Sequence, residues 1–301
     1  MECVPNFSEG KDRQKIDSII GALVAGPDVR VLDAQMDADH NRSVITFVGS
    51  RESVGEAALR AIGRAAELID LNDHRGVHPR MGATDVVPFV PITGVELRDC
   101  VQIAQWVARD TWRRFHIPTY LYEEAARDPR RKHLEYVRRG QFEQLREDVR
   151  RNPDRRPDFG EDDLHPTAGA TAIGARNFLI AYNINLNTSD PGLAKSIAGK
   201  IRASNGGLPA VKAIGIAVES AGVVQVSINL TDFLTTSITT VFDAVAAEAA
   251  RAGVTVESSE IVGLVPRRAI AEADIARLKL LNFGPGLILE NRLEEGQEDE
   301  R

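Results

Sequence analysis

Two histidines and an arginine, His74, His78 and Arg80, lie on one short polar segment of this sequence. An imidazole has an ordinary pKa near ~6.5, so it is the side chain best suited to take and return a proton at neutral pH. Because His78 precedes Pro79, its backbone is restricted to extended conformations, and the side chain is held in place. His78 is therefore a candidate general acid and base. The alternative is a histidine with a purely structural role.

A second polar cluster lies between two expected strands and comprises Asp37, Asp39, His40, Asn41 and Arg42. Hairpin tips are often polar without having a function. A guanidinium group, however, can hold a carboxylate through two parallel hydrogen bonds, which an ammonium group does less well. Arg42 and Arg80 are therefore candidate carboxylate ligands. Asp37 and Asn41 are candidate substrate contacts beside them.

The six histidines do not form a metal-binding signature. His74 and His78 are four residues apart, but Gly76 and Pro79 disfavour the helix that would bring such a pair onto one ion. The sequence also contains no phosphate-binding glycine loop and no nucleophilic serine motif. Its two cysteines fit small buried side chains. We therefore expect acid and base chemistry without a bound metal.

The elements that must position these residues follow from the hydrophobic pattern. The polar segment lies between a helix expected over residues 53–69 and a strand over 85–89. The first half is predicted to contain, in order, a strand over 2–7, a helix to about residue 24, strands over 29–34 and 43–48, and then this helix and strand. A further helix beginning at residue 94 and a strand over 118–122 extend the series.

The second half repeats the pattern. A charged helix over 127–158 and a glycine-rich and alanine-rich linker over 159–176 are expected to lead into strands over 178–186, 210–218, 223–230 and 254–262, with helices over 191–203 and 235–252. The predicted fold is α/β (α+β), with two tandem ferredoxin-like βαββαβ subdomains, residues 1–173 and 174–301, whose sheets flank a ligand groove. A short helix over 269–280 and a disordered acidic tail over 294–301 complete the prediction.

Charge and hydropathy exclude several classes of protein. The 301-residue chain has a net charge of −7, which argues against nonspecific binding of nucleic acid. No apolar run is long enough to cross a bilayer and no leader is visible, so a cytoplasmic location without membrane contact is expected. Residues 127–156 nevertheless contain eleven Lys and Arg against six Asp and Glu. A solvated helix face is the favoured explanation, and an electropositive wall beside an anionic substrate is the alternative.

The sequence strongly resembles the glutamate formiminotransferase family over nearly its whole length. The shared words include Glu-Cys-Val-Pro-Asn-Phe-Ser-Glu-Gly at 2–10, His-Pro-Arg-Met-Gly at 78–82, Gly-Ala-Thr at 169–171, Gly-Ala-Arg at 174–176, Asn-Ile-Asn-Leu at 183–186 and Val-Gly-Leu-Val-Pro at 262–266. Long words in both halves make this resemblance much more specific than a single short motif.

The resemblance implies transfer of a formimino group between 5-formiminotetrahydrofolate and L-glutamate, as part of histidine degradation and one-carbon metabolism. It implies a homodimer that uses tetrahydrofolate, in some cases polyglutamylated, as the carrier, and no metal. Carried over by position, His78 matches the catalytic histidine. The folate-binding segment matches Gly160, Leu164, His165, Pro166, Thr167, Ala168 and Gly169.

The sequence departs from the family pattern at a few positions. Val77 and Gln35 stand where acidic residues are expected, and residues 161–163 add negative charge to the folate segment. We expect these changes to affect the substrate preference rather than the fold. Formyl transfer between N-formylglutamate and tetrahydrofolate, or folate binding without catalysis, therefore stay open as alternatives. The length leaves no room for the cyclodeaminase domain of bifunctional members, so a separate cyclodeaminase is a candidate partner.

Overall fold

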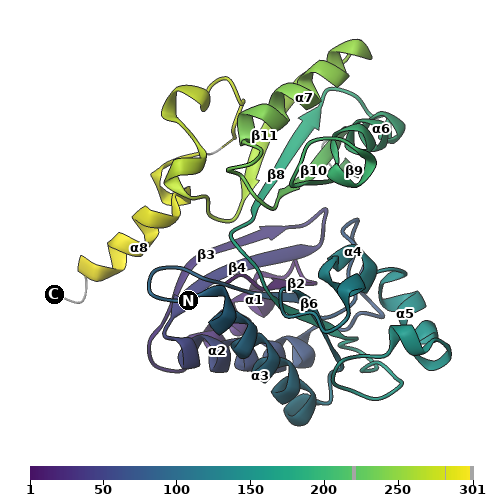
Figure 1. Ribbon diagram of the computed structural model, residues 1–301, viewed down its shortest axis with the longest axis vertical. Coiled ribbons are helices and arrows are strands. Elements are labelled where there is room, and N and C mark those ends of the chain that lie inside the picture. Colours follow the sequence, from purple (N-terminus) through teal and green to yellow (C-terminus); the bar gives the residue numbers. More distant parts are fainter. Residues whose placement is uncertain (219–221, 282, 299–301) are drawn as a thin grey trace. The chain divides into compact units, whose positions relative to one another are not determined.

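The computed structural model describes residues 1–218, 222–281 and 283–298 and divides the chain into two compact units, Met1–Asn177 and Phe178–Arg301 (Figure 1). The break expected between residues 173 and 174 would cut strand β7 (Thr171–Ala175). That strand pairs with two strands of the first unit, and the division accordingly falls just after it.

The first unit begins with the predicted βαββαβ series. Its elements are β1 (Glu2–Cys3), β2 (Asn6–Phe7), α1 (Arg13–Leu23), β3 (Val29–Asp37), β4 (Arg42–Gly49), α2 (Arg51–Leu68) and β5 (Thr84–Val90), followed by α3 (Leu97–Phe115) and β6 (Thr119–Glu123). The strand expected over residues 2–7 is split into β1 and β2. Pro5 lies at the interruption, and a proline has no N–H to donate to a sheet.

The seven strands form one sheet. Strand β3 pairs with β4, which pairs with β1 and β2, and these in turn pair with β5, all in antiparallel fashion. This order is that of a ferredoxin-like unit. Strands β7 and β6 extend the sheet beyond β5 in parallel. The expected fold is therefore confirmed, with two strands added at one edge of the sheet.

Strand β7 corrects one expectation, because residues 159–176 were predicted to be a linker. The side chains of Thr171 to Ala175 are all buried in the sheet, and small side chains suit this position because neighbours pack closely against it. A Cβ atom at Gly174 would lie 2.6 Å from the ring of Tyr122. The composition that suggests a loop thus reflects a crowded strand.

Helices α1, α2 and α3 lie together along one face of this sheet (Figure 1) and bury its main core. The opposite face, at the β5, β7 and β6 end, is covered by a second cluster that includes Tyr120, Tyr122, Phe142 and Leu145. Phe142 and Leu145 come from helix α5 (Gln141–Arg151).

The charged helix expected over residues 127–158 is broken into pieces. These are a 3₁₀ turn at Pro129–Lys132, the single-turn helix α4 (Leu134–Val137), α5 and a second 3₁₀ turn at Pro153–Arg155. Each 3₁₀ turn starts at a proline. Gly140, whose φ of 82° favours glycine, precedes α5. These prolines and this glycine therefore interrupt the single helix that the sequence pattern predicted.

Several arginines of this basic stretch hold the segment together. Arg155 is 6% exposed and donates to the carbonyl oxygens of Tyr136, Val137 and Arg139. Arg131 is 8% exposed and pairs with Asp158 at 2.7 Å. These two side chains are therefore neither a solvated helix face nor a wall available to a substrate.

The second unit is an antiparallel ferredoxin-like layer. Its elements are β8 (Ile180–Leu186), α6 (Pro191–Ile201), β9 (Val211–Val218), β10 (Val223–Leu230), α7 (Ile238–Arg251) and β11 (Val256–Val262), in the sheet order β11-β8-β10-β9. Helices α6 and α7 bury its core. The predicted second βαββαβ series is confirmed.

Two expectations for the end of the chain are wrong. The segment predicted as a helix over 269–280 contains 3₁₀ turns at Arg267–Ala269 and Glu272–Asp274. The tail expected to be disordered contains the end of helix α8 (Leu289–Glu298), and residues 299–301 lie outside the described part. The helix is anchored at its start, where buried Leu289 donates its backbone N–H to the carbonyl of Val265.

Glu2 is a buried carboxyl group in the middle of the first sheet. It is 1% exposed, and one of its carboxyl oxygens has no hydrogen-bond partner among the described residues. Burial raises the pKa of Glu2 to about 7, although the positive charges of Arg176 and the N-terminus act in the opposite direction. The charged form of Glu2 therefore destabilises the folded unit.

We expect Glu2→Gln to stabilise the protein above pH 7 by roughly 3 kcal/mol at most, the equivalent of the raised pKa. Because the folded-state pKa exceeds the unfolded one, the difference from wild type should shrink as the pH falls from 7 toward 4.5. Urea denaturation of both proteins across this range measures it. A difference that stays constant with pH would contradict this account.

Candidate active site

The segment after helix α2 is fastened to the turn between β3 and β4. Nε2 of His74 donates to the carbonyl of Asn41 at 2.8 Å, and Nδ2 of Asn41 donates to the carbonyl of Arg75 at 2.9 Å. Gly76 allows the close approach, because a Cβ atom there would lie 2.4 Å from the carbonyl oxygen of His40. The two polar clusters found in the sequence therefore form one site.

His78 and Arg42 meet at the centre of this site. NH1 of Arg42 lies 2.7 Å from Nε2 of His78. A guanidinium group can only donate, so Nε2 must accept this hydrogen bond, and the imidazole is neutral with its proton on Nδ1. Burial, followed by the charges of Arg42, Arg138 and His40, holds the pKa of His78 well below its ordinary value.

Buried His40 pairs with the partly exposed Asp37 beside His78. Oδ2 of Asp37 lies 2.6 Å from Nδ1 of His40, and Oδ1 accepts from the His40 backbone N–H at 2.9 Å. Burial by itself would raise the pKa of Asp37, but the hydrogen bonds from His40 outweigh this effect and lower it. The His40 and His78 ring centroids are 6.1 Å apart.

His40 is the site residue that sequence reasoning did not select. It is 2% exposed, and its Nε2 has no hydrogen-bond partner among the described residues. The sequence noted it only as part of a polar hairpin. Its three-residue spacing from Asp37 was the one available signal, and such spacings are common in turns.

Asn41, predicted as a substrate contact, joins three segments in this structure. Besides donating to Arg75, its Oδ1 accepts from the backbone N–H of Gly10 at 2.9 Å. Its φ of 47° is left-handed, a conformation that asparagine tolerates better than most residues. Both ends of the amide are thus used to hold the site together.

Arg80, predicted as a carboxylate ligand, already holds a carboxylate of the protein. Its NH1 and NH2 donate to the two carboxyl oxygens of Glu143 at 2.8 and 2.6 Å, and its Nε donates to Nδ1 of His74 at 3.1 Å. His74 is therefore neutral, and burial lowers its pKa, with the charge of Arg80 acting in the same direction. Of the two arginines predicted as carboxylate ligands, Arg42 is the one with a hydrogen bond to His78.

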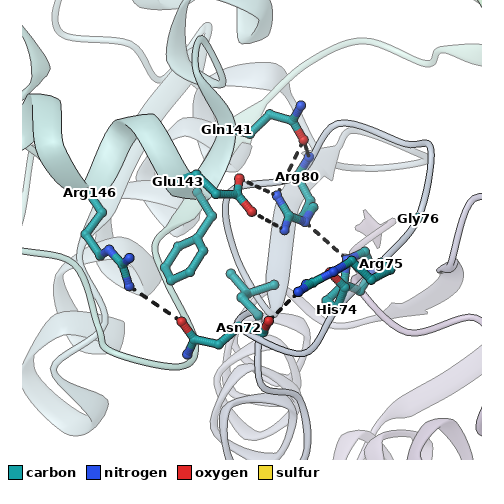
Figure 2. Close-up of a pocket in the computed structure, with 10 residues that line it drawn as sticks. Asn72, His74, Arg75, Gly76, Arg80, Gln141, Glu143 and Arg146 are labelled. Atoms are coloured by element: carbon teal, nitrogen blue, oxygen red, sulfur yellow. Dashed lines mark hydrogen bonds and ion pairs between the residues drawn. The ribbon is translucent and has the colours of Figure 1, made fainter.

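A pocket of about 390 Å³ lies beside this arrangement (Figure 2). Its lining residues are Leu71, Asn72, His74, Arg75, Gly76, Arg80, Gln141, Phe142, Glu143 and Arg146. Three arginines against one glutamate leave a formal charge of +2, with His74 neutral. The pocket is therefore suited to an anionic group.

The expected folate segment packs behind this pocket. The carbonyl of Thr167 accepts from the N–H of Leu71 at 2.9 Å, and the carbonyl of Pro166 accepts from the Asn72 side chain at 3.0 Å. The segment closes on itself, since Nδ1 of His165 accepts from the N–H of Ala168 at 3.0 Å. It thereby positions two residues that line the pocket.

The remaining members of the segment have structural surroundings of their own. Leu164 is buried in the same hydrophobic cluster as Leu71 and Phe142, and Gly160 has a φ of 145°. The negative charge at residues 161–163 is balanced by the basic stretch: Asp162 pairs with Arg156 at 2.6 Å and Asp163 with Arg150 at 2.8 Å. The seven expected folate residues are not among those that line the pocket.

No group of three or more potential metal ligands occurs among the described residues. Within the same residues, no helix is long and apolar enough to cross a membrane.

Comparison with known proteins identifies the class. The model of the formiminotransferase domain, N-terminal subdomain, matches residues 1–176, and that of the formiminotransferase domain matches residues 181–278. Together these matches cover most of the chain. The chain belongs to the formiminotransferase family, and it is therefore a transferase.

Individual relatives are similar over most of this chain. A Thermoplasma acidophilum protein named glutamate formimidoyltransferase is 45% identical, over 98% of this chain and 97% of its own. A Streptococcus pyogenes protein of the same name is 44% identical, over 97% and 98%. A Mus musculus formimidoyltransferase-cyclodeaminase is 42% identical over 91% of this chain, which spans only 51% of that protein.

A substitution at Gly169 tests whether the expected folate segment supports the site through packing. Its φ is 67°, and a Cβ atom would lie 2.3 Å from the carbonyl oxygen of Met81. We expect Gly169→Ala to reduce the free energy of unfolding by about 2–6 kcal/mol, through left-handed strain and overpacking together. Gly94→Ala is the control, because Gly94 has a φ of 76° and open space around it. Equal losses in urea denaturation would contradict the packing role.

Arg80 can be tested against its partner. Arg80→Lys removes the donor to buried Nδ1 of His74, and we expect it to cost about 1–3 kcal/mol of unfolding free energy. Glu143→Gln should cost below about 1 kcal/mol, since the Glu143 side chain is 61% exposed and its ion pair is screened by water. Thermal or urea unfolding measures both. A larger loss for the Glu143 variant would show that the ion pair, rather than the contact with His74, matters most.

Proposed function

We propose that this chain transfers a formimino group between 5-formiminotetrahydrofolate and L-glutamate, with His78 as general acid and base. The full-length similarity to two proteins named glutamate formimidoyltransferase supports the reaction. The observation that carries the assignment of His78 is its neutral imidazole, hydrogen-bonded to Arg42 in a site that includes a partly exposed aspartate paired with a buried histidine.

The reaction needs a proton to leave the attacking nitrogen and a proton to reach the departing nitrogen. The amine nitrogen of glutamate attacks the amidine carbon and must lose a proton, while the departing folate nitrogen must gain one. A single imidazole can take the first proton as a base and return it as an acid. His78 suits this task because it is neutral at physiological pH and so has a lone pair.

The charge of the site fits both substrates. Glutamate and folate carry carboxylates, and Arg42 and the positively charged pocket are the groups that would attract them. Asp37 and Asn41 would hold Arg42 and the neighbouring loop in place, while Arg80 would shape the pocket through Glu143. The segment from Gly160 to Gly169 would contribute to folate binding by positioning Leu71 and Asn72.

The wider setting belongs to the same proposal. Tetrahydrofolate acts as the one-carbon carrier, in histidine degradation, and a cytoplasmic homodimer is the expected form. Relatives named formimidoyltransferase-cyclodeaminase are about twice as long as the part this chain matches. A separate cyclodeaminase is therefore the partner we propose for the next step.

The first test is a turnover assay with 5-formiminotetrahydrofolate and L-glutamate, with 5-formyltetrahydrofolate run beside it. We expect His78→Ala to lower the rate of formimino transfer about 10²- to 10⁴-fold, the usual contribution of acid–base catalysis, with folate affinity nearly retained. His133→Ala, a change at an exposed histidine, serves as the control.

Three results would count against the proposal. Activity with the formyl donor alone would assign formyl transfer instead. Tight folate binding by the wild type without turnover of either donor would indicate a binding protein. Full activity of His78→Ala would leave the reaction in place but remove His78 from it.

A further inference from the structure

The hydrogen bond from Arg42 occupies the ring nitrogen of His78 that a base would use. We propose that the carboxylate of the acceptor amino acid binds Arg42 and releases Nε2 of His78, so that binding of the acceptor creates the catalytic base. This inference rests on the proposed function and adds a role for Arg42 as the residue that couples acceptor binding to proton transfer.

The first step concerns the protein without substrate. Nε2 of His78 accepts from NH1 of Arg42 at 2.7 Å, and a guanidinium group stays protonated at any physiological pH. A proton arriving on Nε2 would face this N–H directly and would have to break the hydrogen bond. His78 is therefore a weak base as long as Arg42 holds it.

The second step concerns what can displace this hydrogen bond. A carboxylate is a better partner for a guanidinium group than a neutral imidazole, because it carries the opposite charge and can accept two parallel hydrogen bonds. Arg42 begins strand β4, directly opposite Asp37 in the register. Both oxygens of Asp37 accept hydrogen bonds from His40. Asp37 is thus one anion next to Arg42, and the carboxylate of the acceptor would be a second.

The third step concerns the charges that face His78. Arg42 comes from β4, Arg138 follows α4, and His40 lies in the turn before β4. Arg138 forms an ion pair with buried Asp85, and His40 is paired with Asp37. A carboxylate on Arg42 would offset the cation that contacts His78 most closely. Proton uptake by His78 would then become easier.

The chemical step then balances. As the bond from the acceptor nitrogen to the formimino carbon forms, Nε2 of His78 takes a proton from that nitrogen. As the bond from the carbon to the folate nitrogen breaks, the same proton passes from Nε2 to the folate nitrogen. Without an acceptor carboxylate the base stays bound to Arg42, so water is poorly activated and the donor is protected from hydrolysis.

Titration of His78 by nitrogen-15 NMR tests this inference without requiring turnover. The His78 signals are assigned with His78→Gln, and the protein is titrated alone, with L-glutamate, and with L-glutamate plus tetrahydrofolate, which carries no transferable group. We expect L-glutamate to raise the pKa of His78 by about one pH unit or more, as a nearby anion does. The diamide of L-glutamate, which lacks both carboxylates, should have no effect.

Variants of Arg42 separate this role from simple binding. In Arg42→Gln the pKa of His78 should be higher than in wild type before any ligand is added, and L-glutamate should no longer change it. Hydrolysis of 5-formiminotetrahydrofolate without acceptor should rise relative to transfer, and the KM for glutamate should increase. Arg98→Gln is the control, because the Arg98 side chain is 76% exposed and pairs with Glu96 at the start of helix α3.

The outcomes are distinguishable from failure of the proposed function. A His78 titration that L-glutamate leaves unchanged, both with and without tetrahydrofolate, would overturn the inference even if formimino transfer is observed. An unchanged His78 pKa in Arg42→Gln would overturn it as well. A wild-type protein without formimino transfer would refute the proposed function instead, whatever the NMR titration shows.

Discussion

The site depends on the hydrogen bonds between the segment after α2 and the turn between β3 and β4. His74 and Asn41 make these bonds, and Gly76 allows the two backbones to touch. Without this contact, His78 and Arg42 would lie on separate loops more than thirty residues apart in sequence. The sheet supplies the frame, since β3 and β4 present the turn and α2 delivers the segment. A few hydrogen bonds to backbone carbonyls therefore bring the two candidate functional side chains together.

Arginine has three different uses in the first unit. Arg155 ties together the carbonyls of a broken helix, Arg80 holds Glu143 and fixes the tautomer of His74, and Arg42 contacts the nitrogen of His78. All three carry the same charge, but their partners differ. A carbonyl, a carboxylate and an imidazole respond differently to an arriving anion. The hydrogen bond from Arg42 to His78 is the one that we propose a substrate carboxylate displaces, because a carboxylate carries the opposite charge and can accept two parallel hydrogen bonds.

The family match and the geometry support each other at different levels. The match covers both ferredoxin-like units and establishes a transferase, whereas the contacts within the first unit suggest how one histidine can serve as base and acid. The expected folate segment illustrates the relation. In the structure its residues pack behind the pocket and support Leu71 and Asn72. A residue can therefore matter to a binding site by positioning those that line it.

The sequence by itself determined the two βαββαβ series, because hydrophobic periodicity is local and each helix or strand carries its own pattern. It also singled out His78 and Arg42 by residue type. Tertiary structure alone decided that residues 171–175 are a buried strand, that Arg80 is engaged by Glu143, and that His40 lies beside His78. These features are pairings between residues far apart in the chain. Which partner a buried charge finds depends on the folded arrangement, which local patterns do not encode.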